Sequence, residues 1–250
     1  MPDDRIVGIP PSASDTLLRS WGYDPGTATV TIGSAVTYSE MLDGPLATLV
    51  PALSDAARTV GSPQIRNLAT IGGNVCNASP AGDTIGACLA YQGVLHVHGT
   101  QGVRQEPLST FFKGPGRTVL TPGDIVTAVS LPLPPPKNAG KYIKLGRNTK
   151  SDLSIVGVAV LGYVDASAPS GFRFRLALAS VAPTPLVPLQ AEKILAEKPL
   201  SVDTMAEAAQ AAMDACNPIS DVRGSARYRK YMVRNLVLQA VQAVAAELRA

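Results

Sequence analysis

The sequence of 250 residues contains no run of Lys and Arg longer than two residues, and its formal net charge is only +3. Nucleic-acid-binding proteins usually cluster their basic residues, so we exclude that class. Long hydrophobic runs are also missing, because the longest, residues 154–164, is short and broken by glycine. The opening residues are acidic and contain prolines, unlike a signal peptide. We therefore predict a cytoplasmic protein with neither a membrane nor a nucleic acid as partner.

Cysteine and histidine are scarce. The three cysteines, Cys76, Cys88 and Cys216, are odd in number and have no metal-type spacing, which indicates free thiols in a reducing compartment. His96 and His98 would share one face of a strand, but a zinc site needs three or four protein ligands. The sequence places no third ligand, so we predict no metal site.

Motifs of the common catalytic classes are absent too. There is no Gly-x-Ser-x-Gly, no Walker motif and no Gly-x-Gly-x-x-Gly. With two histidines, a hydrolytic triad has nothing to support it. A chain so poor in acid–base groups is typical of a protein whose bound cofactor performs the chemistry.

The first half of the chain shows strand and helix signals. Alternation predicts a strand within residues 28–37, and helical spacing of apolar residues predicts one helix over 46–60. We expect the stretch of residues 70–83 to be an irregular loop, followed by a short helix over 83–93 with Asp83 as its N-cap. Further strands are predicted at residues 94–98 and 124–133.

The clearest break in composition is "PLPPPKNAG", residues 132–140, which is typical of a stiff spacer between domains. We therefore expect one domain over residues 1–135 and another over 139–250. Three strands are predicted after the break, within residues 141–146, 153–165 and 172–182. Three helices are predicted to follow, within residues 185–198, 202–215 and 225–250. This order indicates an α+β arrangement, in which a small antiparallel sheet carries helices on one face.

The stretch "TIGGNVCNASPAGD", residues 70–83, holds the candidate site. Gly72 and Gly73 would let a ligand approach the backbone, and consecutive amides in such a turn can bind phosphate. Thr70, Asn74 and Asn77 supply donors, and Asp83 could accept from the hydroxyls of a polyol. The alternative is a plain glycine turn followed by an N-capping aspartate. The local pattern leaves both open.

Basic residues in the second half have two interpretations. Lys144, at the predicted junction of the domains, could face a cleft or be solvated. The stretch "SARYRKYMVR", residues 225–234, with Arg223 before it, would spread its charges over a helix. A solvated surface or a subunit contact would account for it.

Several segments resemble, in order, the flavoprotein subunit of the molybdenum hydroxylases, such as xanthine dehydrogenase and carbon monoxide dehydrogenase. They are "GSPQIRNLATIGGNVCNASPAGD" (61–83), "LSTFFKGPGRTVLTPGDIVTAVSLP" (108–132), "YIKLGRNTKSDLSIVGVAV" (142–160), "LALASVAPTPL" (176–186) and "DACNPISDVRGSARYRKYMVRNLV" (214–237). The resemblance covers nearly all of the chain from about residue 27.

The resemblance implies a PCMH-type FAD-binding α/β domain, followed by an α+β domain like the C-terminal domain of the CO dehydrogenase flavoprotein. Thr70, Ile71, Gly72, Gly73 and Asn74 would approach the FAD pyrophosphate, with Asn77 and Asp83 near the phosphate and ribityl parts. Ile125 would line the flavin pocket, Lys144 would lie close to the isoalloxazine ring, and Leu153 beside it. No residue of this chain is expected to be catalytic, because the cofactor carries the chemistry.

The resemblance also implies partners. An iron–sulfur small subunit would pass electrons to FAD, a molybdopterin large subunit would hydroxylate the substrate, and NAD, oxygen or another molecule would accept the electrons. The chain contains no second glycine-rich loop of the kind that opens family members, so we expect an N-terminally shortened FAD domain. Two alternatives remain: a flavin-free scaffold subunit of such a complex, and a stand-alone FAD oxidoreductase.

Overall fold

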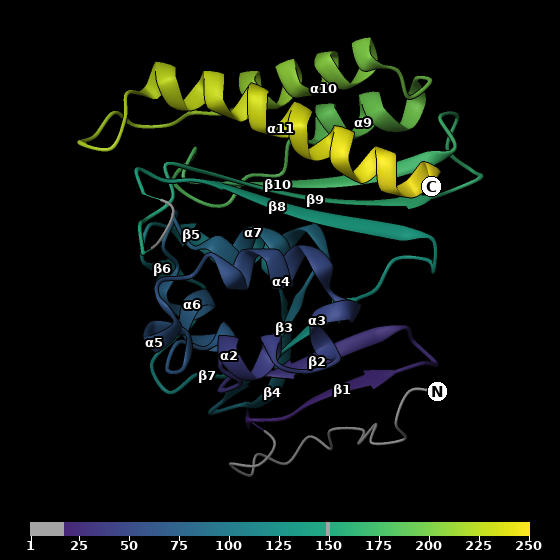
Figure 1. Ribbon diagram of the computed structural model, residues 1–250. Coiled ribbons are helices and arrows are strands. Elements are labelled where there is room, and N and C mark those ends of the chain that lie inside the picture. The colour runs from purple at the N-terminus through teal and green to yellow at the C-terminus, as the bar shows by residue number, and fades with distance from the viewer. Residues whose placement is uncertain (1–17, 149–150) are drawn as a thin grey trace.

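The computed structural model describes residues 18–148 and 151–250. Part of the predicted shortened N-terminus, and Thr149 and Lys150 of one family-like segment, lie outside these residues. The described chain forms four layers, a sheet, a set of helices, a second sheet and a second set of helices (Figure 1).

The first layer is an antiparallel sheet of five strands in the order β1-β2-β7-β3-β4. Its strands are β1 (Trp21–Asp24), β2 (Thr29–Gly33), β3 (Val94–Gly99), β4 (Gly102–Pro107) and β7 (Ile125–Pro132). Val30, Ile32, Leu95 and Val97 are fully buried, whereas the alternating Thr31 and His96 face the other side. The predicted strands are therefore confirmed within a few residues.

Helices cover the buried face of this sheet. They are α2 (Tyr38–Leu42), α3 (Leu46–Leu49), α4 (Pro51–Arg58), α5 (Pro63–Arg66), α6 (Ile71–Asn77), α7 (Asp83–Ala90) and α8 (Leu108–Phe111), with a small hairpin of β5 (Phe112–Gly114) and β6 (Arg117–Thr118). The single helix predicted over 46–60 is wrong. Pro51 cannot donate to a preceding turn, so α3 ends at Leu49 and α4 begins at Pro51.

The second sheet contains β8 (Asn138–Leu145), β9 (Val156–Val164) and β10 (Phe172–Ala179), all antiparallel, with β9 in the centre. Helices α9 (Leu189–Glu197), α10 (Val202–Ala215) and α11 (Ala226–Arg249) lie on one face (Figure 1). The α+β fold class, with three strands followed by three helices, is confirmed.

The other face of the second sheet packs against the first half of the chain. Helix α4 contacts β8, and α7 contacts β9 and β10. Tyr142, Ala159, Leu161 and Ala177 accordingly belong to the same buried cluster as the first sheet. The proline-rich segment makes a short link between β7 and β8, but the two halves share a core and are not held apart.

No helix in the described part of the chain is long and apolar enough to cross a membrane.

Candidate functional site

The glycine pair lies in helix α6 (Ile71–Asn77), so the irregular loop predicted for residues 70–83 is wrong over this helix. Helix α6 starts after Thr70, whose backbone is extended and whose hydroxyl oxygen accepts from the Gly73 amide at 3.0 Å. A Cβ on Gly72 would lie 2.5 Å from Ser34 Cβ and 2.7 Å from the Ser34 carbonyl oxygen. Gly72 is therefore explained by close packing of α6 on the end of β2, without any ligand.

The amides at the start of α6 already have acceptors within the protein. Ile71 donates to the Val36 carbonyl at 3.4 Å, and Gly72 donates to the Ser34 carbonyl at 3.0 Å. The Gly73 amide donates to the Thr70 hydroxyl oxygen, as described above. The arrangement differs from the tight glycine turn with outward amides that the sequence suggested, because a helical first turn binds its own amides to nearby carbonyls and to a cap.

Side-chain donors on α6 are less occupied. Asn74 accepts from the Thr84 hydroxyl through Oδ1 at 3.1 Å, which leaves its amide nitrogen to donate. Asn77 is exposed at the end of the helix. In the described part of the chain, neither the Asn74 nitrogen nor the Asn77 side chain has a hydrogen-bond partner.

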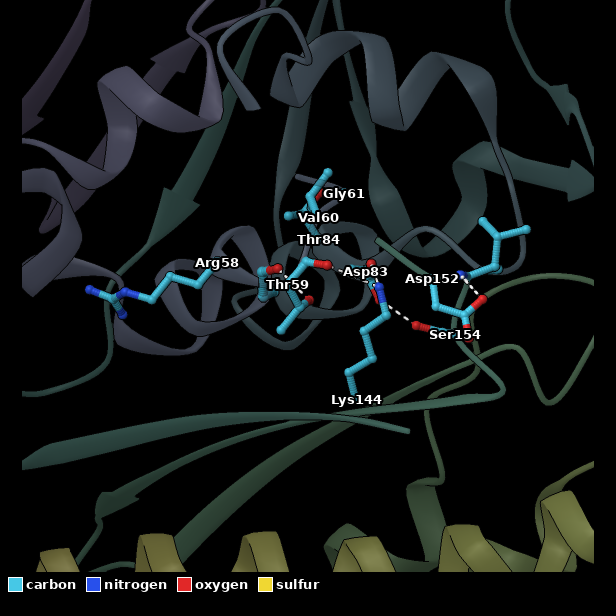
Figure 2. A network of polar contacts seen from close by, with 12 residues as sticks. Arg58, Thr59, Val60, Gly61, Asp83, Thr84, Lys144, Asp152 and Ser154 are labelled. Carbon is cyan, nitrogen blue, oxygen red and sulfur yellow. Dashed lines mark hydrogen bonds and ion pairs between the residues drawn. The ribbon is translucent and has the colours of Figure 1, made fainter. Parts of the chain in front are cut away.

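Asp83 forms the centre of a buried polar network (Figure 2). Its Oδ2 accepts from Lys144 Nζ at 2.7 Å, and its Oδ1 accepts from the Tyr142 hydroxyl at 2.8 Å and from the Ser154 hydroxyl. Only 8% of the Asp83 side chain and 10% of the Lys144 side chain are exposed. The predicted N-cap role is wrong, because Gly82 occupies that position and the Asp83 carboxylate turns toward β8 instead.

Burial and the neighbouring carboxylate raise the pKa of Tyr142 well above its usual value of 10. The phenol therefore stays protonated and donates to Asp83 over the whole physiological range. Since Tyr142 and Lys144 are two residues apart on β8, they point to the same face and meet the same carboxylate.

Lys144 also connects the network to the end of α4, where its Nζ donates to the Thr59 carbonyl at 3.0 Å. Next to it, Arg66 Nη1 donates to the carbonyls of Arg58, Val60 and Gly61 at 3.2, 3.0 and 3.3 Å. Cations thus lie at the C-terminus of α4, and a carboxylate lies at the first residue of α7. Both placements are favourable for the helix dipoles.

A second branch joins the network to α6. Thr84 follows Asp83 in the chain, and its hydroxyl contacts the Tyr38 hydroxyl at 2.7 Å and Asn74 Oδ1. Hydrogen bonds and adjacent residues therefore run from Asn74 to Lys144. This branch joins Asn74 of the glycine-containing stretch to Lys144 of the second sheet, two predicted residues that are far apart in the sequence.

The other two predicted residues lie at the margin. Leu153 is 59% exposed in the loop between β8 and β9, directly before Ser154. The carboxylate of the preceding residue, Asp152, accepts from the backbone amides of Arg147 and Asn148 at 2.6 and 3.2 Å. Ile125 is 60% exposed at the start of β7 and is not one of the residues of the Asp83 network described above.

The network residues that sequence reasoning missed are Tyr142, Ser154 and Thr59, together with Tyr38 and Thr84 of the second branch. The i, i+2 spacing of Tyr142 and Lys144 on a predicted strand could have indicated Tyr142. Nothing local marks Thr59, which takes part through its backbone. The part of the chain that the structure describes contains no group of three or more His, Cys, Asp or Glu residues able to hold a metal ion.

Comparisons with known proteins agree with this architecture. A family model described as the FAD binding domain in molybdopterin dehydrogenase matches residues 21–134. A second, the CO dehydrogenase flavoprotein C-terminal domain, matches residues 141–244. These two matches define the class as a flavoprotein-type subunit of two successive family domains.

Individual relatives narrow the class. The chain is 33% identical over 218 residues to the putative xanthine dehydrogenase FAD-binding subunit XdhB of Escherichia coli K12. The aligned residues make up 86% of this chain and 74% of that protein. It is 30% identical over 217 residues to the carbon monoxide dehydrogenase medium chain of Hydrogenophaga pseudoflava, covering 86% and 75%. A solved structure of carbon monoxide dehydrogenase from that organism superposes with a TM-score of 0.86, covering 93% of this chain and 79% of the other, at 30% identity. The chain belongs to the family of FAD-binding medium subunits of xanthine and carbon monoxide dehydrogenases.

Proposed function

We propose that this chain holds FAD and serves as the electron-transfer subunit of a molybdopterin-dependent hydroxylase. When bound, the flavin would accept electrons and release them to an acceptor. The protein would bind and orient it. Two observations support the proposal. The chain belongs to a family of FAD-binding subunits, and a polar network connects α6, α7 and β8, where the predicted binding residues lie.

The residues present fit a ligand with a diphosphate and a polar ring. Thr70, Asn74 and Asn77 would donate to phosphate oxygens, since each keeps a side-chain proton for an external acceptor. Lys144 uses two of its three protons on Asp83 and Thr59, so one is left for the flavin. Ile71, Gly72 and Gly73 would shape the wall, and Ile125 and Leu153 would supply exposed apolar contacts.

Asn74→Asp is the sharpest test of this assignment. The aspartate keeps an oxygen for the Thr84 hydroxyl, but replaces the free amide nitrogen with a negative charge. Losing one hydrogen bond to a phosphate costs about 1.5–3 kcal/mol, or about 10- to 150-fold in Kd, before any repulsion is added. We expect wild-type protein to release near-stoichiometric FAD on denaturation and Asn74→Asp to release much less. Asn235→Asp, on an exposed face of α11, is the matched control. Equal FAD in both variants would reject the assignment.

A second candidate is a flavin-free scaffold subunit. It is favoured by the observation that Asp83 and the first amides of α6 already have partners within the protein. A wild-type chain that is purified without FAD, and stays without it when mixed with excess FAD, would support this candidate.

The proposed partners are an iron–sulfur subunit that delivers electrons and a molybdopterin subunit that oxidises the substrate. NAD or oxygen would be the final acceptor. Medium chains of carbon monoxide dehydrogenase are among the relatives, which favours a heteromeric complex over a stand-alone FAD oxidoreductase. Metal analysis of the purified protein would distinguish these two candidates. Iron and molybdenum that co-purify with this chain would favour the heteromeric complex, since a stand-alone enzyme would carry FAD alone.

A further inference from the structure

A cavity of about 410 Å³ lies between α9, the edge strand β10 and the turn that joins β9 to β10. None of the residues that line it belongs to the Asp83 network or to the predicted flavin site. Its volume falls within the range of about 300–1,000 Å³ that is typical of small-molecule sites. The C-terminal domain therefore has room for a ligand of its own.

The helix and the strand form the two walls of this cavity. Leu189, Glu192 and Ala196 follow the spacing of a helix, so they lie on one side of α9, and that side faces the cavity. Arg173 and Arg175 are two residues apart on β10 and share one side of the strand. Side chains of opposite charge are thereby brought to the same space.

Glu192 is a half-buried carboxylate without a cation. Its Oε1 accepts from the Leu176 amide at 2.7 Å, and its second oxygen has no hydrogen-bond partner in the described part of the chain. Burial raises the pKa of Glu192 to about 7, although the Leu176 amide and the positive charge of Arg175 oppose this rise. A cation supplied by a ligand would therefore stabilise the ionised carboxylate.

Arg175 is the opposite charge that lacks a bonded partner. Within residues 18–148 and 151–250, its guanidinium forms no hydrogen bond and no ion pair, although it acts electrostatically on Glu192. The neighbouring cations differ, because Arg173 pairs with Asp165, and Lys193 is 61% exposed and pairs with Glu197 at 3.9 Å. One guanidinium and one carboxylate thus line the same cavity without contacting each other.

The edge of β10 adds backbone groups to the site. The Leu176 amide donates to Glu192, and the Leu178 amide donates to the Leu186 carbonyl at 2.8 Å, so both are directed away from β9. Phe174 lines the cavity, and the alternation of an antiparallel strand directs its amide and carbonyl the same way. In the described chain, neither Phe174 group has a hydrogen-bond partner outside the sheet. The cavity therefore offers one backbone donor and one backbone acceptor.

We propose that this cavity binds a free α-amino acid with an apolar side chain. The ammonium group would donate to the second oxygen of Glu192 and to the Phe174 carbonyl. The carboxylate would accept from Arg175 and from the Phe174 amide, and Leu189 and Ala196 would contact the side chain. A ligand with only one of the two charges would leave either Glu192 or Arg175 without a partner, which favours a zwitterion. This binding site goes beyond the proposed flavin function.

The test uses the full chain as it is purified, together with any subunits that accompany it. Isothermal titration calorimetry measures the binding of L-leucine. Two analogues with the same carbon skeleton are compared with it: 4-methylpentanoate lacks the ammonium group, and 3-methylbutylamine lacks the carboxylate. The variants are Glu192→Gln, which keeps an acceptor for the Leu176 amide, and Arg175→Met. Glu207→Gln on α10 and Arg227→Met on α11 are the matched controls, since neither residue lines the cavity.

We expect wild-type protein to bind one L-leucine per chain. Both analogues, and L-leucine with either cavity variant, should bind about tenfold more weakly or worse, whereas the two controls should resemble wild type. Absence of saturable L-leucine binding at millimolar concentration would overturn the proposal, and so would wild-type affinity in both cavity variants. An analogue that binds as tightly as L-leucine would also overturn it, because the site would then take a simple anion or cation. If Arg175→Met lowers Tm, Glu192→Gln decides.

The affinity should also depend on pH, because the ammonium group requires an ionised Glu192. A pKa of about 7 predicts binding about eightfold tighter at pH 7.5 than at pH 6, and Glu192→Gln should abolish this difference. The other titratable or charged groups that line the cavity are Arg173 and Arg175 on β10, Tyr163 on β9, and Lys193 and Glu197 on α9. Helix α10 also packs on α9, but none of its charged residues lines the cavity. Tighter binding at pH 6 would contradict the assignment of the ammonium group to Glu192.

Failure of the proposed function has a different signature, because released FAD is measured on the same samples. A chain that binds L-leucine but neither carries nor takes up FAD would remove the flavin assignment alone. A chain that carries FAD but does not bind L-leucine would overturn the amino-acid site alone.

Discussion

Replacing Lys144 with methionine should destabilise the protein strongly, because it leaves the Asp83 carboxylate buried without its cation. The two groups are 2.7 Å apart and each is at least 90% buried. Breaking such a pair from one side costs about 3–5 kcal/mol. The Thr59 carbonyl also loses its donor. For a chain of this size, that cost corresponds to a fall in Tm of roughly 6 to 20 °C.

Lys141→Met is the matched control. It removes a lysine from the same strand, but this one pairs with Asp55 at 3.1 Å and is 47% exposed. An exposed pair contributes about 0.2–1 kcal/mol. Thermal and urea unfolding, followed by circular dichroism, measures both variants.

The double variant Asp83→Asn/Lys144→Met gives the coupling between the two residues. Asparagine can still accept from Tyr142 and Ser154, so the double variant should be more stable than the sum of the single changes predicts. If Lys144→Met is no more destabilising than Lys141→Met, the ion pair does not hold α4, α7 and β8 together and the reasoning is refuted.

Three further predictions concern other parts of the structure. Gly72→Ala should cost about 1–3 kcal/mol because its Cβ meets the Ser34 backbone, whereas Gly73→Ala, whose nearest neighbour is the Thr70 hydroxyl oxygen at 3.1 Å, should be tolerated; equal unfolding free energies would contradict this. Burial raises the pKa of Glu192 to about 7 from its usual 4.5, so the folded state keeps this proton to a higher pH than the unfolded state does. The free energy of unfolding therefore falls as the pH rises from about 4.5 to about 7. Glu192→Gln keeps an acceptor for the Leu176 amide and should therefore be more stable than wild type by about 1–2 kcal/mol at pH 8 but not at pH 4; a pH-independent difference would count against it. Arg66→Ala should destabilise the end of α4 by about 1–3 kcal/mol through three carbonyls that lose a charged donor, and an unchanged Tm would show that water replaces it.

The strands and long helices followed from the sequence because their hydrophobic periods are regular. β9 and α11 begin and end close to the predicted positions, for this reason. Helix α6 did not, because Gly-Gly followed by Asn has poor helix propensity. The Thr70 cap and the packing of Gly72 on Ser34, distant in the sequence, override that propensity.

Sequence reasoning named Asp83 and Lys144 of the polar network but not the contacts that join them. Local pattern singled out Asp83 and Lys144, yet gave them separate roles. Their ion pair depends on α7 packing against the second sheet, a contact between segments 61 residues apart. The alternation of residues along β8 does not show which helix packs against which face of the strand. The sequence therefore could not predict that Lys144, Tyr142 and Ser154 all donate to the Asp83 carboxylate.

The second sheet lies between two layers of helices, and neither of its faces is free. Cutting the chain in the link between β7 and β8 would expose the apolar side of α4 and α7 in one fragment, and the sheet face that carries Tyr142, Leu161 and Ala177 in the other. Neither fragment would be expected to persist alone, since each would present a contiguous apolar patch to water. Heating the intact chain should therefore give one calorimetric transition, with equal van't Hoff and calorimetric enthalpies, although two family domains follow one another along the sequence.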